Sequence, residues 1–205
     1  MELIGGRPER YWRTVGDFYT VLKEEPRELD HAIRVCYNVH SIGAIIGGID
    51  PDKYHGDPLM DEQLDLAALG HDIGKWKVPK PNNMKNGMEK SFWRQEMKSV
   101  SATMASDFME RHGYPEEAVT DVVVLISSSD ERYSLRAERL HDADILDFLR
   151  KLEDPEWYDH WGIGEKTEKI MKYVPKLMTP SVQLLKRHMF RNPELSHVMK
   201  SGLCI

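Results

Sequence analysis

The stretch Leu64–Lys75, LDLAALGHDIGK, decides what the rest of the chain is expected to be. Its first half is apolar on nearly every side of a helix that starts at about Asp61, and His71 and Asp72 follow this segment directly. An unpaired carboxylate in such a setting is costly to bury. We therefore expect both groups either to be satisfied by polar partners or to hold something positive.

A second apolar helix, predicted for residues 135–152, carries an ionisable group in the same kind of setting. Asp144 has apolar neighbours one turn away on both sides, and Asp142 and Asp147 offer further carboxylates nearby. The cost of burying an unpaired charge applies here too. This helix is therefore a second source of acidic ligands.

His31 lies at the start of another long apolar helix, which Asp30 is expected to cap and the Gly47-Gly48 pair to end. Two imidazoles and two carboxylates suit a divalent ion of intermediate hardness. On an octahedral ion they would leave two positions for water and substrate. Such an ion acidifies water and can direct it at a phosphorus centre, so the pattern indicates a hydrolase.

Apolar periodicity predicts helices along nearly the whole chain and no strand of useful length. We therefore expect an all-α helical bundle that forms a single domain over residues 1–205. The segment 78–90, rich in proline and asparagine, is expected to be a loop and a candidate lid, after which Ser91 caps the next helix. Three shorter helices are predicted for residues 165–178, 181–191 and 194–201.

The composition excludes several classes of protein. With 205 residues, 40% hydrophobic and 30% charged, the chain is in the range of globular domains and has no apolar run that could span a membrane. The net charge of −6 argues against a nucleic-acid or anionic-membrane surface. Cys36 and Cys204 indicate no disulfide framework, and the N-terminus has no secretory signal pattern, so we expect a cytoplasmic protein.

Three segments resemble, in order, the three motifs of the HD-domain metal-dependent phosphohydrolases: DHAIRV at 30–35, LAALGHDIGK at 66–75 and HDADILDFL at 141–149. The resemblance covers about residues 28–152 and implies an HD-domain-like helical core there, with residues 160–205 as a helical appendage. It implies that His31, His71, Asp72 and Asp144 hold one divalent ion (Mn, Fe, Co, Ni, Zn or Mg). Asp144 is chosen over Asp142 because the last ligand of the family follows an alanine and precedes x-Leu.

The resemblance also implies an activity. The expected reaction is the hydrolysis of a phosphomonoester or phosphoanhydride in a small, nucleotide-like substrate by metal-activated water. Asp72 would bind the ion and orient or deprotonate the water, and Lys75, one turn past His71, would neutralise phosphate charge. Arg34, one turn past His31, would face the same substrate. His40 is nine residues from His31, on the opposite helix face, and is excluded as a ligand.

Some family members hold a second metal ion with additional histidines. Here Met97 or Ser99 stands where one such histidine is expected, and Ser127–Ser129 replace a common His-His pair. We therefore expect one ion. The segment HDIGKWKVP also resembles the cyclic-dinucleotide phosphodiesterase branch, but the missing histidines speak against that branch, and Gly113-Tyr114-Pro115 is explained by a helix stop and start. The other alternative is a regulatory module with the HD fold and no catalysis; a homo-oligomer is also possible.

The first predicted helix, which ends before Pro26, raises one more candidate. Some nucleotide-cleaving members place a substrate-binding Arg-Trp pair ahead of the first motif, and Arg10, Trp12 and Arg13 lie at a similar distance here. Their order is broken, and Trp12 also fits an apolar stripe, so we predict core packing for it. The stripe comprises Trp12, Val15, Phe18, Tyr19 and Leu22.

Overall fold

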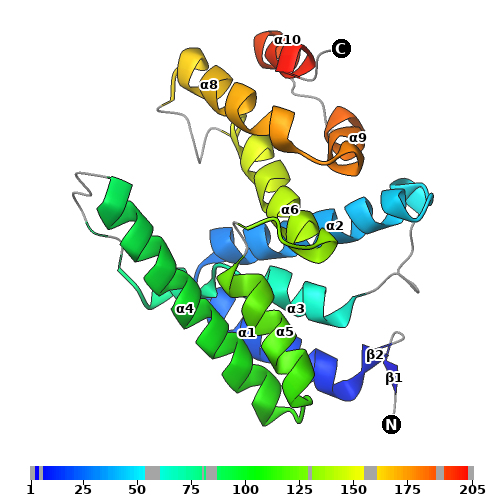
Figure 1. Cartoon of the computed structure of the whole chain (residues 1–205), viewed down its shortest axis with the longest axis vertical. Helices are drawn as coiled ribbons and strands as arrows, with labels where there is room; N and C mark the ends of the chain where they lie inside the picture. The colour runs from blue at the N-terminus through cyan, green and yellow to red at the C-terminus, as the bar shows by residue number, and fades with distance from the viewer. Residues whose placement is uncertain are drawn as a thin grey trace.

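The computed structural model describes residues 3–4, 7–53, 61–79, 81, 87–128, 131–154, 161–187 and 192–202. Over these residues the chain is an all-α bundle with one short antiparallel strand pair, β1 (Leu3–Ile4) with β2 (Arg7–Pro8) (Figure 1). The all-α prediction is therefore confirmed. The helices are α1 (Glu9–Leu22), α2 (Pro26–Ile46), α3 (Glu62–Gly70), α4 (Gly87–Arg111), α5 (Glu116–Ser127), α6 (Leu135–Lys151), α8 (Ile163–Tyr173), α9 (Thr179–Arg187) and α10 (Pro193–Gly202), with 3-10 turns η1 (Pro51–Lys53), η2 (Ile73–Trp76) and η3 (Val174–Lys176).

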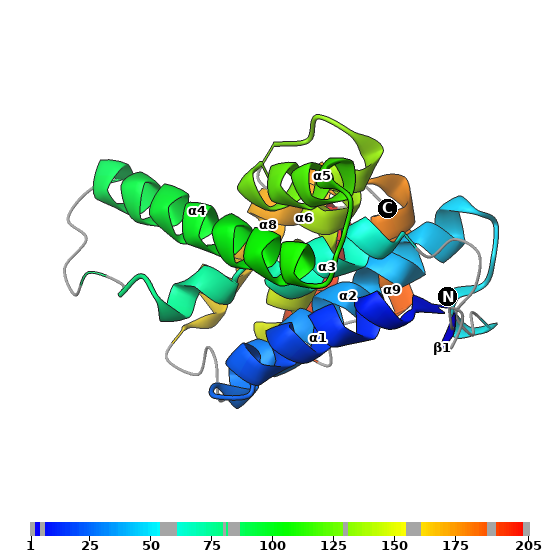
Figure 2. The same cartoon turned by 90° about the horizontal axis from the view of Figure 1, so that it is seen from below.

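The short helix α3 lies at the centre of the bundle. It packs against α1, α2, α4, α5 and α6, and Figure 2 shows it between the α1–α2 side and the α5 side. Most of its side chains are buried, among them Leu64, Leu66 and Ala68. A segment that is apolar on nearly every side therefore forms a helix that other helices surround, as its sequence predicts. Because α3 is fixed by so many neighbours, the residues that follow it are fixed too.

The long helices α2 and α6 pack against each other, and α9 contacts both of them (Figure 1). Both helices contribute fully buried side chains to the core, among them Val35 and Ile42 of α2 and Leu140 and Leu149 of α6. This interface brings His31 of α2 and Asp144 of α6 together with the end of α3. No helix in the described ranges is both long and apolar enough to cross a membrane.

Several predicted boundaries were wrong, and each has a physical reason. Helix α2 begins at Pro26, not after Asp30, because proline has no backbone N–H to lose in the first turn of a helix. Helix α4 begins at Gly87, ahead of Ser91, so the predicted loop is shorter than expected, and residues 80 and 82–86 of the candidate lid fall outside the described residues. The helix from about Asp61 was predicted to end near Gly74, but α3 ends at Gly70, where the chain tightens into η2.

The inward face of α1 differs from the predicted stripe. Trp12 and Tyr19 are 42% and 53% exposed, so core packing of Trp12 is contradicted. The buried residues are Tyr11, Thr14, Phe18 and Leu22. Thr14 enters the core because its hydroxyl donates to the Arg10 carbonyl at 2.9 Å, which satisfies its polar group. A prediction that selects only apolar residues for the buried helix face misses a buried threonine of this kind.

Gly74 allows η2 to lie against α4. A Cβ at this position would be 2.2 Å from the Met97 carbonyl oxygen and 2.8 Å from Ser101 Oγ, to which the Gly74 N–H donates. We expect Gly74→Ala to lower the free energy of unfolding by about 1–3 kcal/mol, because overpacking forces backbone to shift. Urea unfolding measures this change.

Gly16→Ala on α1 is the matched control for Gly74→Ala. A Cβ at Gly16 meets nothing within 4 Å, so this substitution should be neutral or stabilising by about 0.5–1 kcal/mol. If Gly74→Ala proved as harmless as Gly16→Ala, the close contact between η2 and α4 would be wrong.

Candidate metal centre

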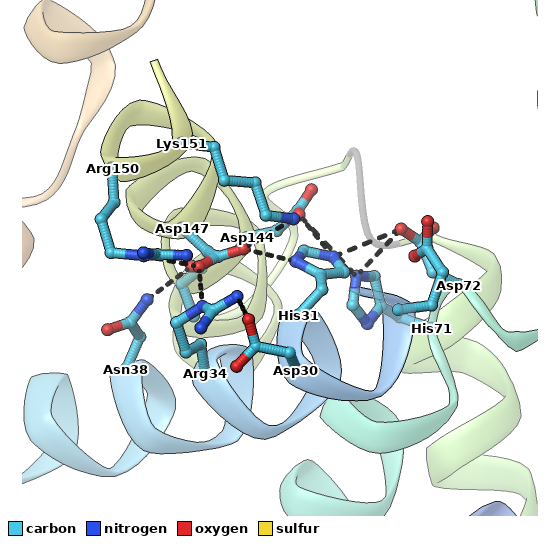
Figure 3. Close-up of polar contacts among 12 residues, drawn as sticks. Asp30, His31, Arg34, Asn38, His71, Asp72, Asp144, Asp147, Arg150 and Lys151 are labelled. Carbon is cyan, nitrogen blue, oxygen red and sulfur yellow. Dashed lines mark hydrogen bonds and ion pairs between the residues drawn. The ribbon is translucent and has the colours of Figure 1, made fainter. Parts of the chain in front are cut away.

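Four side chains from three parts of the chain converge at the meeting point of α2, α3 and α6. His31 comes from α2, His71 and Asp72 from the turn between α3 and η2, and Asp144 from α6 (Figure 3). One ligand atom of each residue lies within 4.8 Å of those of the other three. The structure thus brings together the four residues named from the sequence as metal ligands.

The spacing of the ligand atoms suits a single ion. His31 Nε2 lies 3.3 Å from His71 Nε2, 3.4 Å from Asp72 Oδ2 and 3.3 Å from Asp144 Oδ1. Ligands about 2.1 Å from an ion are about 3.0 to 3.4 Å apart when they subtend 90° to 109°. His71 Nε2 lies 3.5 Å from Asp72 Oδ2 and 3.8 Å from Asp144 Oδ1, and all four atoms lie within 4.8 Å of one another, so the cluster is close in size to the set of ligands around one divalent ion.

Both imidazoles are held by the nitrogen that faces away from the centre. His31 Nδ1 lies 2.7 Å from Asp147 Oδ2, and His71 Nδ1 lies 2.8 Å from the carbonyl oxygen of Ala68. The Ala68 carbonyl is available because α3 ends at Gly70 and leaves its last carbonyls without helical partners. With Nδ1 as donor, each ring turns the lone pair of Nε2 toward the centre, as metal-binding histidines do.

The centre is buried on the histidine side and open on the carboxylate side. His31 and His71 are buried, whereas the Asp144 side chain is 45% exposed. Asp72 is intermediate. Water or a small molecule can therefore approach an ion there past Asp144.

The electrostatics of the cluster favour bound positive charge. Burial opposes charge on His31, but hydrogen bonds from its N–H groups to Asp144, Asp147 and Asp72 raise its pKa well above the ordinary value. Although burial would raise the pKa of Asp144, its hydrogen bonds with both histidines hold that pKa well below the usual range. The carboxylates thus stay ionised, and the cluster attracts a cation.

Lys75 lies beside the centre and is paired with Asp72. Its Nζ contacts Asp72 Oδ2 and lies 3.5 Å from Glu28 Oε2. Burial opposes the charge on Lys75, but these two carboxylates raise its pKa, so the ammonium persists at neutral pH. Burial would raise the pKa of Asp72, but the charge of Lys75 together with the two histidines lowers that pKa below its ordinary value. Contact of Lys75 with a substrate stays a prediction.

Arg34 lies on the outer side of His31, not among the four ligand atoms. Its Nε donates to Asp147 Oδ1 at 2.7 Å, and its Nη2 pairs with Asp30. Asp147 in turn contacts Arg150 and Lys151 (Figure 3). The predicted substrate contact of Arg34 is untested, and its observed partners are two carboxylates.

Asp147 was named only as a carboxylate near Asp144, with no role, and Glu28 was not named, although the sequence held a signal for each. Asp147 is one turn past Asp144 and shares its helix face, and Glu28 is one turn before His31. A metal-binding histidine usually donates its other nitrogen to a carboxylate or carbonyl. A search for acidic residues one turn from each proposed ligand would have found both.

The remaining candidates lie outside the cluster. His40 Nε2 is 2.9 Å from Asp65 Oδ1, and His112 Nε2 is 3.0 Å from Asp17 Oδ2. Met97 is buried in α4, and Ser99 is exposed on it. Arg13 pairs with Glu9 within α1. His55, His160 and His188 are outside the described residues.

The fold and the site define an all-α protein with a partly buried His/Asp cluster that could hold a metal ion. The chain matches the family model described as a domain of unknown function (DUF4202) over residues 18–196, and it belongs to that family. The matched span contains all four clustered residues. Comparisons with curated proteins and with solved structures gave no match.

Proposed function

We propose that this chain is an HD-type, metal-dependent phosphohydrolase that acts on a small, nucleotide-like phosphomonoester or phosphoanhydride. The observation that carries the proposal is the convergence of His31, His71, Asp72 and Asp144 on one point, with both Nε2 atoms turned inward. These residues occupy the three HD-like motifs in order along the chain. The all-α core is the setting that the resemblance implies.

The donor set fits a divalent ion in charge as well as in spacing. Two carboxylates, Asp72 and Asp144, would balance its charge, while two imidazoles add neutral nitrogen ligands. Mn²⁺, Fe²⁺, Co²⁺, Ni²⁺, Zn²⁺ and Mg²⁺ all remain candidates for such a set. When bound, the ion would polarise a phosphoryl oxygen and make water a better nucleophile.

The chain's own residues divide the remaining work. The carboxylate of Asp72, whose pKa is held below its ordinary value, would orient the attacking water by accepting a hydrogen bond. Lys75, held beside Asp72, would stabilise the charge of the phosphate as it changes. The bound ion and Lys75 would give this acidic chain, with a net charge of −6, a local positive site for an anionic substrate.

The proposal is tested with purified chain and a panel of phosphate compounds. Nucleoside mono-, di- and triphosphates, a generic phosphomonoester and a cyclic dinucleotide are each assayed for hydrolysis with the six divalent ions in turn. We expect ion-dependent phosphate release from one class of nucleotide or phosphomonoester. Asp72→Asn should reduce that release to background, whereas Asp17→Asn, at a partly buried carboxylate on α1, should not.

The panel also separates the alternatives. Hydrolysis of the cyclic dinucleotide alone would place the chain in the phosphodiesterase branch. A chain that binds one ion per molecule but hydrolyses none of the compounds would contradict the enzyme and indicate a regulatory module.

A further inference from the structure

We infer that Asp147 is the positioning residue of the metal centre, because it fixes the ring of His31 in the tautomer and orientation that present Nε2 to an ion. The inference rests on the proposed metal centre and adds a residue outside its ligand set. It also assigns a different role to Arg34, as a support for Asp147.

Asp147 is a carboxylate with four donors around its two oxygens. Oδ2 lies 2.7 Å from His31 Nδ1 and 2.9 Å from Lys151 Nζ. Oδ1 lies 2.7 Å from Arg34 Nε and 3.2 Å from Arg150 Nε. Because each oxygen is engaged on two sides, the carboxylate cannot turn without breaking charge-assisted hydrogen bonds.

Burial makes this arrangement specific. The Asp147 side chain is fully buried, so its charge must be compensated by protein groups. Arg34, Arg150 and Lys151 provide more positive charge than one carboxylate needs for compensation. His31, the fourth donor, is itself one of the four clustered residues. These three cationic side chains therefore fix the Asp147 carboxylate, and the carboxylate orients the ring of His31.

The helix geometry explains how two helices share this task. On α6, Asp144 and Asp147 are three residues apart and lie on one face. On α2, His31 and Arg34 have the same spacing. His31 and Asp144 face the centre, whereas Arg34 and Asp147 contact each other behind it (Figure 3). The packing of α2 on α6 and the orientation of His31 are thus set by the same contacts.

The test compares Asp147→Asn with Asp142→Asn. Both aspartates are fully buried on α6 and paired with an arginine, but Asp142 contacts Arg132 and the Met178 N–H and has no contact with His31. The side chain of an asparagine at 147 has a single oxygen. It can therefore accept hydrogen bonds from His31 and Lys151 or from the two arginines, but not from both sides at once. We expect a 10- to 100-fold weaker affinity for Mn²⁺ in Asp147→Asn, which is the usual effect of removing the carboxylate that orients a metal-binding histidine.

Calorimetric titration with Mn²⁺ measures that affinity, and thermal unfolding is followed in parallel. Both variants should lower the midpoint of unfolding, and only Asp147→Asn should weaken Mn²⁺ binding. Equal Mn²⁺ affinity in wild type and Asp147→Asn would overturn the inference and leave the proposed function standing. An equal loss in Asp142→Asn would also overturn it. Absence of Mn²⁺ binding in the wild type would contradict both the positioning role of Asp147 and the proposed metal-dependent function.

A measurement on the wild type decides the matter if Asp147→Asn fails to fold. Nitrogen-15 NMR of the Zn²⁺-loaded chain distinguishes the two ring nitrogens of each histidine. We expect His31 to carry its proton on Nδ1 and to bind the ion through Nε2. Binding through Nδ1 would contradict a positioning role for Asp147.

Discussion

Replacing Asp144 by asparagine is expected to weaken divalent-metal binding by on the order of 100-fold or more and to reduce phosphate release to background. Asp144 Oδ1 lies 3.3 Å from His31 Nε2 and 3.8 Å from His71 Nε2, close enough to share one ion with both imidazoles. The amide keeps the shape of the side chain but removes a negative charge and an anionic ligand. Equilibrium dialysis against Mn²⁺ and a phosphate-release assay measure the two effects.

The matched control is Asp121→Asn on α5. The Asp121 side chain is 41% exposed, close to the 45% of Asp144, and it pairs with Arg136 away from the centre. Metal binding and hydrolysis should be unchanged in this variant. If Asp144→Asn bound Mn²⁺ as tightly as Asp121→Asn, Asp144 would not be a ligand.

The second large effect is expected from Phe18→Ala in α1. Phe18 is fully buried, packs edge-to-face on Phe108 with ring centroids 5.2 Å apart, and lies so close to Gly70 that a Cβ there would be 2.8 Å from its ring. Removing the ring should lower the free energy of unfolding by about 3–5 kcal/mol, since it opens a cavity in the core. Urea unfolding of the chain measures the loss.

The neighbouring residue provides the control for this core prediction. Tyr19 is exposed, and Tyr19→Ala should change the free energy of unfolding by no more than about 0.5 kcal/mol. The sequence pattern placed both residues in one inward stripe, whereas the structure separates them. Similar losses for Phe18→Ala and Tyr19→Ala would support the stripe and contradict the observed orientation of α1.

Most of the helices and the clustered residues could be predicted from the sequence. A segment such as LDLAALG is apolar except for Asp65, so it has to be surrounded by other helices, and the groups that follow it are held in place with it. His71 and Asp72 could be placed at a buried site for this reason. The resemblance then supplied His31 and Asp144, which lie far from them in sequence.

The details that were missed depend on contacts between distant segments. The burial of Thr14 and the exposure of Trp12 follow from how α1 lies on the bundle, which apolar character alone does not determine. The spacing of Arg34, one turn past His31, indicated a shared helix face, but its partner Asp147 is 113 residues away. Local spacing shows which groups share a helix face; it does not show which group on another helix they meet.

The central claim is that His31, His71, Asp72 and Asp144 form one site for one divalent ion. It is tested most directly by X-ray absorption spectroscopy of the chain loaded with one equivalent of Co²⁺ or Zn²⁺. The geometry predicts a shell of nitrogen and oxygen ligands at about 2.0–2.2 Å that includes two imidazoles. A shell without imidazole, or an ion that stays fully hydrated in solution, would contradict it.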